Sequence, residues 1–135
     1  MKSELIDFLE KLNNDVNGTL LGIDIKKYVS KIQEFATIIS ISKEEEIKAF
    51  IAFYENDENK NEAFLTMLAV SKDCWHLGYG KSLLEFSIQE LQKKGFKRYK
   101  LEVKEVHLNA VKLYVKYEFK SVGIKNGIIT MEKKL

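Results

Sequence analysis

The stretch AFLTMLAVSKDCWHLGYGKS, residues 63–82, decides the predicted fold. Its first part, Ala63 to Val70, is apolar on both faces, which predicts a strand that is covered on both sides and therefore central in a sheet. Its last part, Trp75 to Ser82, carries two glycines at a spacing of two and leads into residues 79–94. There the leucines and isoleucines recur at helical spacing, so a strand, a glycine-rich turn and an amphipathic helix are predicted in that order.

The two glycines of this turn, Gly78 and Gly80, favour a phosphate or pyrophosphate site. Glycine lets the backbone approach a ligand closely and exposes its N–H groups. The start of the following helix adds about half a positive charge, and the two features together bind anions. A tight strand-to-helix turn without any ligand explains the same two glycines equally well.

Two well-known phosphate loops fit this segment poorly. Gly80-Lys81-Ser82 imitates the end of a P-loop, but that motif needs a further glycine where Trp75 stands. A dinucleotide fingerprint needs a third glycine at the position of Leu83. A P-loop-like nucleotide-binding domain therefore stays a less favoured alternative.

The rest of the chain predicts helices and strands around this central unit. Asp24 is the expected N-cap of the second helix, Asn13-Asn14-Asp15 and Asn17-Gly18 are expected to end the first, and Asn126-Gly127 is a hairpin signal. The predicted elements are helices at 3–12, from 24, at 79–94 and at 108–117, and strands at 36–42, 47–54, 63–70, 98–104, 119–122 and 128–132. The order α-α-β-β-β-α-β-α-β-β predicts an α/β (α+β) fold with a mixed central sheet of about six strands and helices on both faces.

Composition bounds the function. The 135 residues suit one domain, 1–135. The net charge is +2 and the lysines are scattered, so no nucleic-acid partner is expected. One cysteine and two histidines without metal-ligand spacing predict neither a disulfide nor a metal site. No apolar run reaches membrane-spanning length and no signal-peptide pattern is visible. A cytoplasmic protein without a membrane partner is expected.

Several segments, in the right order, resemble the GNAT superfamily of acyltransferases. Its signature is Arg/Gln-x-x-Gly-x-Gly/Ala, which Gly78 and Gly80 match while Trp75 replaces the basic or amide residue. Leu68-Ala69-Val70 looks like the strand that lines the pantetheine arm in that family. LEV at 101–103, NAVKLY at 109–114 and Phe119 resemble its later motifs. The resemblance covers about residues 36–132, and residues 1–35 would be the variable substrate-side helices.

The resemblance implies a GNAT fold and an N-acetyltransferase. Such an enzyme moves acetyl from acetyl-CoA to a primary amine, on a small molecule or a peptide, by direct attack without a covalent enzyme intermediate. A homodimer is left open. The alternative is a catalytically silent acyl-CoA-binding regulatory domain, because the glycine loop is altered.

Site roles also follow from the resemblance. The residues expected to bind the cofactor are Leu68, Val70, Trp75, His76, Leu77, Gly78, Tyr79, Gly80, Lys81, Ser82 and Asn109. Tyr114 is expected as the general acid that protonates the departing thiolate, with core packing as its alternative. Asn109 either contacts the cofactor or caps its helix. Glu102 corresponds to a base used by some relatives, or is a plain exposed carboxylate. Glu105 and His107 are further candidates for this role, and a water relay is left open.

Three positions depart from the family pattern. Trp75 and Leu77 remove two polar phosphate contacts, so binding is expected to rely on backbone N–H groups. Glu118 stands where a glycine normally precedes Phe119. Because glutamate is costly in a left-handed backbone, we expect the turn at Glu118 to have changed its conformation.

Overall fold

The computed structural model describes residues 2–15 and 23–135. In chain order its elements are α1 (Lys2–Asp15), α2 (Ile25–Phe35), β1 (Thr37–Lys43), β2 (Glu46–Tyr54), β3 (Glu62–Val70), the short 3-10 helix η1 (Lys72–Cys74), α3 (Tyr79–Lys94), β4 (Arg98–Lys104), α4 (Leu108–Lys116), β5 (Lys120–Lys125) and β6 (Ile128–Lys134). The strands form one six-stranded mixed sheet in the order β1-β2-β3-β4-β6-β5. This architecture confirms the predicted fold class, element order and central position of β3.

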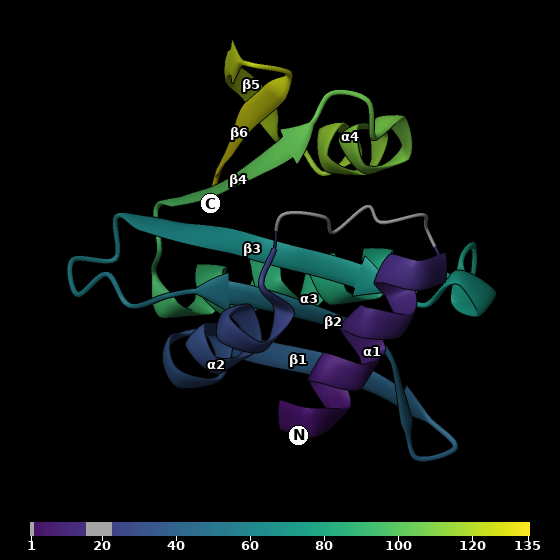
Figure 1. The fold of residues 1–135 in the computed structure, drawn as a ribbon. Coiled ribbons are helices and arrows are strands. Elements are labelled where there is room, and N and C mark those ends of the chain that lie inside the picture. The colour runs from purple at the N-terminus through teal and green to yellow at the C-terminus, as the bar shows by residue number, and fades with distance from the viewer. Residues whose placement is uncertain (1, 16–22) are drawn as a thin grey trace.

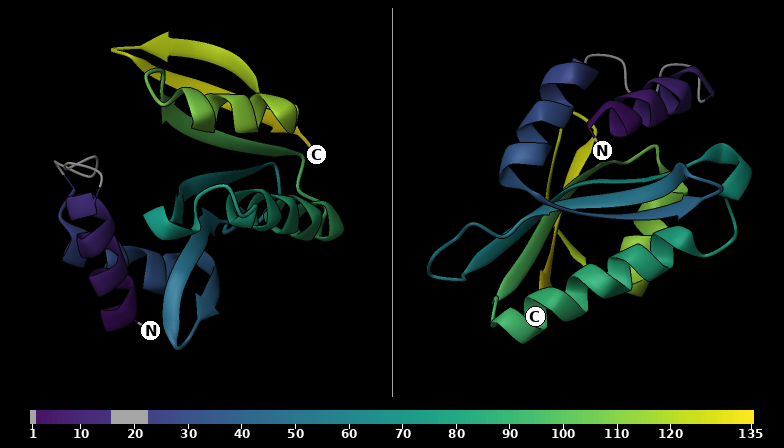
Figure 2. Two further views of the ribbon diagram at one scale, coloured as in Figure 1. Left: turned by 90° about the vertical axis from the view of Figure 1, so that its right-hand side faces the viewer. Right: turned by 90° about the horizontal axis from the view of Figure 1, so that it is seen from below.

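One face of the sheet is covered by α1 and α2 (Figure 1, Figure 2). Leu5 and Leu9 of α1 and Val29 and Ile32 of α2 are buried against the side chains of β2. The N-cap prediction is confirmed, because Asp24 Oδ1 accepts a hydrogen bond from the N–H of Lys27 at 3.1 Å.

The predicted break at Asn13-Asn14-Asp15 is wrong, because α1 continues to Asp15. Side chains such as Asn and Asp disfavour a helix interior only weakly, and the buried leucine stripe, which includes Leu12, outweighs that preference. The second predicted break, at Asn17-Gly18, lies outside the described residues.

The opposite face of the sheet carries α3 and α4 (Figure 2). The predicted stripe of α3, which is Leu83, Leu84, Ile88 and Leu91, is buried there. The core beneath both helices includes the tilted rings of Tyr99 and Phe119, whose centroids lie 5.6 Å apart. This packing fixes α3 and α4 on the same side of the sheet.

The parallel strands β3 and β4 pair over only part of their length. Their pairing runs from Glu62–Arg98 to Leu65–Leu101 and ends there. A β-bulge follows immediately, since Phe53 opposes Leu65 and Ala52 opposes Met67, which leaves Thr66 as an extra residue in β3. The strands diverge beyond this point (Figure 1), and the gap between them positions the site described below.

Helices α3 and α4 end in the same way. Phe96 N–H donates to the carbonyl of Leu91 and Phe119 N–H donates to that of Tyr114, both at 3.0 Å, which is the Schellman pattern. The residue before each phenylalanine has a left-handed backbone, with φ +85° at Gly95 and +70° at Glu118. The expectation of a changed turn is therefore wrong. Glu118 keeps the left-handed conformation, because the bond from Phe119, the 2.9 Å bond from Glu118 N–H to the carbonyl of Val115 and the buried Phe119 ring require it.

The C-terminal strands form the predicted hairpin. Asn126 and Gly127 both have positive φ, as two-residue hairpin turns require. None of the described helices has a stretch both long and apolar enough for crossing a membrane.

Candidate active site

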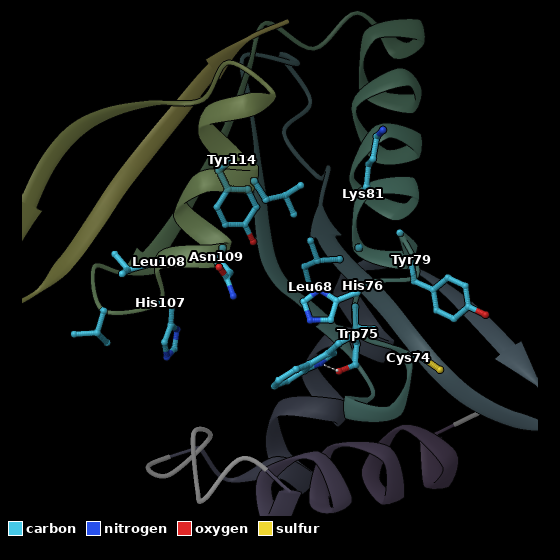
Figure 3. A pocket seen from close by; sticks show the side chains of 16 residues that line it. Leu68, Cys74, Trp75, His76, Tyr79, Lys81, His107, Leu108, Asn109 and Tyr114 are labelled. Carbon is cyan, nitrogen blue, oxygen red and sulfur yellow. Dashed lines mark hydrogen bonds between the residues drawn. The ribbon is translucent and has the colours of Figure 1, made fainter.

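A cavity of about 950 Å³ opens where β3 and β4 diverge. One wall is made by the end of β3, the loop after it and the first turn of α3, and the other by the loop after β4 together with α4 (Figure 3). Its lining residues are Leu68, Val70, Cys74, Trp75, His76, Gly78, Tyr79, Gly80, Lys81, Val106, His107, Leu108, Asn109, Ala110, Leu113 and Tyr114.

The end of β3 turns main-chain groups that do not pair with β2 toward this cavity. Ser71 N–H donates to the carbonyl of Lys48 in β2 at 2.7 Å. In antiparallel sheets such hydrogen-bonded pairs alternate with pairs whose groups point away from each other. The pairs of Val70 with Ala49 and of Leu68 with Ile51 therefore direct the main-chain groups of Val70 and Leu68 away from β2, toward the gap.

The loop between β3 and α3 is anchored by an acidic side chain. Asp73 accepts a short hydrogen bond from Ser71 Oγ and a bond of 3.2 Å from Lys48 Nζ. These two contacts, the one from Ser71 first, lower the pKa of Asp73 to about 2. The carboxylate is therefore charged at neutral pH and ties the loop to β2.

The same loop presents backbone donors at the start of α3. Gly78 is the N-cap of α3 in a left-handed conformation, φ +85°. The first hydrogen bond of the helix runs from Ser82 N–H to the carbonyl of Gly78 at 3.0 Å. The N–H groups of Tyr79, Gly80 and Lys81 thus precede the first i→i−4 bond and are the donors that every helix start leaves free. They lie in the cavity wall and carry the positive end of the helix dipole, so they suit an anionic group.

Trp75 is fixed at the edge of this wall. Its indole Nε1–H donates to the carbonyl of Val70 at 2.9 Å (Figure 3). The ring is 44% exposed and lines the cavity. The neighbouring His76 adopts a left-handed backbone, φ +68°, which turns the chain toward Gly78.

The opposite wall contributes the hydroxyl of Tyr114. This residue is 7% exposed, its ring packs edge-on against Phe119, and its hydroxyl points into the cavity (Figure 3). Burial raises the pKa of Tyr114 to about 12. The phenol therefore keeps its proton across the whole neutral range.

Asn109 lies beside Tyr114 in the same wall, but it is not a cap. The N-cap of α4 is His107, which makes no side-chain capping bond within the described residues. The capping alternative for Asn109 is therefore wrong, because α4 begins one residue before it at Leu108. Its amide is directed to the cavity side (Figure 3).

The structure brings most of the predicted site residues together. Ten of the thirteen line the cavity, while Leu77 and Ser82 lie next to its lining in the chain. Glu102 lies elsewhere: it is exposed in β4 between the buried Leu101 and Val103, so its side chain leaves the opposite face of the sheet. Sequence reasoning missed the apolar lining by Val106, Leu108, Ala110 and Leu113, although these residues flank or fill the NAVKLY segment.

Comparison with known proteins identifies the family. The sequence matches the model of the acetyltransferase (GNAT) family over residues 5–119. The chain belongs to the GNAT acetyltransferase family. The GNAT match begins at residue 5, so most of α1 and all of α2 fall inside the matched region even though they carry none of the motifs quoted above. The predicted enzyme class, an acetyltransferase, is thereby confirmed.

Solved GNAT structures share the fold. The ribosomal-protein-S18-alanine N-acetyltransferase of Escherichia coli is 25% identical, with a TM-score of 0.72, over 83% of this chain and 77% of that one. A GNAT acetyltransferase of Staphylococcus aureus has a TM-score of 0.83 at 18% identity, over 99% and 92%. The PaiA N-acetyltransferase of Thermoplasma acidophilum, solved in complex with coenzyme A, has a TM-score of 0.73 at 17% identity, over 99% and 90%. No curated protein matches the sequence significantly.

Proposed function

We propose that this GNAT protein transfers the acetyl group of acetyl-CoA to a primary amine by direct attack, with Tyr114 as the general acid. The observation that carries the proposal is a single cavity that joins the free N–H groups at the start of α3 to the hydroxyl of Tyr114. Anion binding and proton donation are thus available in one cleft, at two points along it.

The donor side of the cleft fits acetyl-CoA. The N–H groups of Tyr79, Gly80 and Lys81 suit its pyrophosphate, and the outward main-chain groups of Leu68 and Val70 suit the amides of its pantetheine arm. Trp75 and Leu77 supply no charge, so the anion depends on the backbone and on Lys81 in the first turn.

Tyr114 supplies the proton that the leaving group needs. The amine nitrogen bonds to the thioester carbonyl carbon, the C–S bond breaks, and the sulfur takes the proton of the Tyr114 hydroxyl. A phenol whose pKa is about 12 is fully protonated at neutral pH, so this donor is always loaded. The ring contacts with Phe119 hold the hydroxyl in place.

The amine must lose a proton in the same reaction. We retain Glu102 as the proposed base, together with Glu105 and His107 as further candidates. Glu102 projects from the face of the sheet that α1 and α2 cover further along, so it suits an acceptor that arrives from that face. His107 lines the cavity itself. In this proposal residues 1–135 act as one acetyltransferase domain, with residues 1–35 on the acceptor side.

A panel of amines tests the proposal. Free thiol is measured after mixing the protein and acetyl-CoA with small primary amines, amino sugars and peptides with free N-termini, and acetyl-CoA binding is measured by calorimetry. Binding together with turnover on at least one amine is expected. Binding without turnover on any of them favours the silent regulatory alternative. Thermal stabilisation by ATP and Mg²⁺ but not by acetyl-CoA overturns the proposal.

A further inference from the structure

Trp75 occupies the place where the family signature has arginine or glutamine, and its polar group forms a hydrogen bond within the protein. Its Nε1–H donates to the carbonyl of Val70 at 2.9 Å, while its ring lines the cavity. An indole has this one donor and no acceptor. Trp75 therefore has nothing left to offer a phosphate group while the bond to Val70 is made.

The carbonyl of Val70 needs a partner for a structural reason. It faces away from β2, and on its other side the pairing with β4 has already ended at Leu65–Leu101. A main-chain carbonyl at the edge of a cavity is stabilised by any donor that reaches it. In the structure the indole of Trp75 is that donor.

An extended ligand with amide groups would use the same carbonyl. Leu68 and Val70 present main-chain groups two residues apart on a free strand edge, which is the arrangement that binds extended chains by strand addition. The pantetheine arm of CoA is such a chain, because it carries two amides along a flexible backbone. The carbonyl oxygen has two lone pairs, but the Trp75 ring that bonds to it also lines the cavity, so an amide N–H that reaches this carbonyl from the cavity meets the indole there.

We propose that Trp75 is a latch on the cofactor channel: its indole holds the Val70 carbonyl in the free enzyme, and the pantetheine arm of CoA releases it. This inference rests on the proposed function, since it takes CoA as the ligand. The half-exposed ring has solvent on one side and can leave the strand without disturbing the core. Binding of CoA then breaks the hydrogen bond between Trp75 and Val70. A side chain without an N–H at position 75 makes no such bond, so CoA binding would break none.

Trp75→Phe tests the latch because phenylalanine keeps an aromatic ring and lacks the donor. Since one hydrogen bond is worth about 1 kcal/mol, CoA should bind to Trp75→Phe roughly fivefold more tightly than to the wild type by calorimetry. Adenosine 3′,5′-bisphosphate, which has no pantetheine arm, should bind to both proteins equally. Phe86→Leu is the matched control, because Phe86 is an exposed aromatic residue of α3 outside the cavity.

The wild type supplies a second readout that does not depend on a variant folding. Trp75 is the single tryptophan of the chain, so the protein's tryptophan emission reports on it alone. CoA should shift the emission maximum, and adenosine 3′,5′-bisphosphate should leave it in place.

The outcomes separate the latch from the proposed function. Equal or weaker CoA binding by Trp75→Phe, or unchanged emission on CoA binding, overturns the latch while the acetyltransferase proposal stands. An emission shift with the bisphosphate of the same size as that with CoA also overturns it, because the ring would then respond to the adenosine end. A wild type that binds no CoA overturns the proposed function and the latch together.

Discussion

The two walls of the cleft offer different kinds of chemistry. The wall made by β3 and α3 presents main-chain groups, namely the outward groups of Leu68 and Val70 and the free N–H groups at the start of α3. The wall made by β4 and α4 presents side chains, and among them is the Tyr114 hydroxyl, which we propose as the proton donor. We infer that the first wall binds the donor and the second serves the reaction.

This difference explains which substitutions each wall tolerates. A site built from N–H groups survives a change of side chain, so we propose that the anion site at the start of α3 persists although Trp75 and Leu77 replace the usual polar residues. It depends instead on backbone conformation, and therefore on Gly78 at φ +85°. If the other wall acts through the Tyr114 hydroxyl, as we propose, it has no such freedom.

The largest expected effect comes from removing that hydroxyl. Tyr114→Phe should lower kcat by about 100-fold or more, because a positioned general acid contributes 10²–10⁴-fold. The KM for acetyl-CoA should change little, since the main-chain wall is untouched, and the ring contact with Phe119 should preserve stability. Steady-state thiol release with the best amine of the panel measures both constants.

Tyr117→Phe is the control for this comparison. Tyr117 follows α4, lies outside the cavity lining and hydrogen-bonds Glu85 of α3, so its loss should leave kcat within about threefold. Equal losses in the two variants would mean that Tyr114 acts by packing, as its core alternative holds.

The buried proton of the side-chain wall should also appear in the pH dependence of stability. Burial raises the pKa of Tyr114 to about 12 and that of Tyr28 to about 12, against about 10 in an unfolded chain. Between these values the unfolded state releases protons that the native state keeps. The free energy of unfolding should therefore be unaffected by these groups below pH 10, and should fall above it by about 1.4 kcal/mol per pH unit per group. Urea titrations at pH 9 to 11.5 measure this, and Tyr114→Phe should show a shallower decline.

The main-chain wall is tested by its two glycines. A Cβ on Gly78 meets no atom of the described residues within 4 Å, so Gly78→Ala is penalised there only by its left-handed backbone, by about 1–2 kcal/mol. Relief of that strain displaces the first turn of α3, and acetyl-CoA affinity should fall about tenfold.

A Cβ on Gly80 makes ordinary contacts of 3.7 Å with Val70 and 4.0 Å with Leu68, so Gly80→Ala should be neutral or slightly stabilising in the helix. Similar affinity losses in both variants would show that bulk in the cavity, and not backbone conformation, decides binding.

Most of the fold could be predicted from the sequence because its signals are local. The apolar run of β3, the stripe of α3, the Asp24 cap and the Asn126-Gly127 turn each depend on a few neighbouring residues, and all were confirmed. The bulge at Thr66 could not be predicted, since a bulge without glycine leaves no mark in the chain and arises from the pairing of β3 with β2. That bulge accompanies the divergence of the strands, so no local pattern in the sequence predicted the gap between β3 and β4.

The lining of the candidate cavity was largely predictable from the sequence, and its geometry was less so. The glycine loop and the NAVKLY segment indicated which residues form the two walls, because short motifs of this kind have a characteristic backbone conformation. The bond from Trp75 to Val70 and the outward direction of Glu102 depend on long-range placement, which no local pattern encodes. The prediction for the turn at Glu118 was wrong for a related reason. The intrinsic preference of glutamate favoured a changed turn, and the tertiary packing around Phe119 overrode that preference.

The C-terminal ends of α3 and α4 give the smallest predicted effect, a small change in stability. They are also the feature in which the two walls are most alike. Both α3 and α4 end in a Schellman turn, with Gly95 in one and Glu118 in the other at the left-handed position. Glu118→Gly should raise the free energy of unfolding by about 1 kcal/mol, because glycine adopts positive φ without steric cost. The Glu118 side chain is 84% exposed in its 4.0 Å ion pair with Lys133, so this pair contributes little that would be lost. Gly95→Ala should lower stability by about the same amount, since among the described residues a Cβ there meets no atom within 4 Å and the backbone alone is strained. Urea unfolding at pH 7 measures both, and a destabilised Glu118→Gly protein would mean that the carboxylate holds the end of α4 more strongly than the backbone resists it.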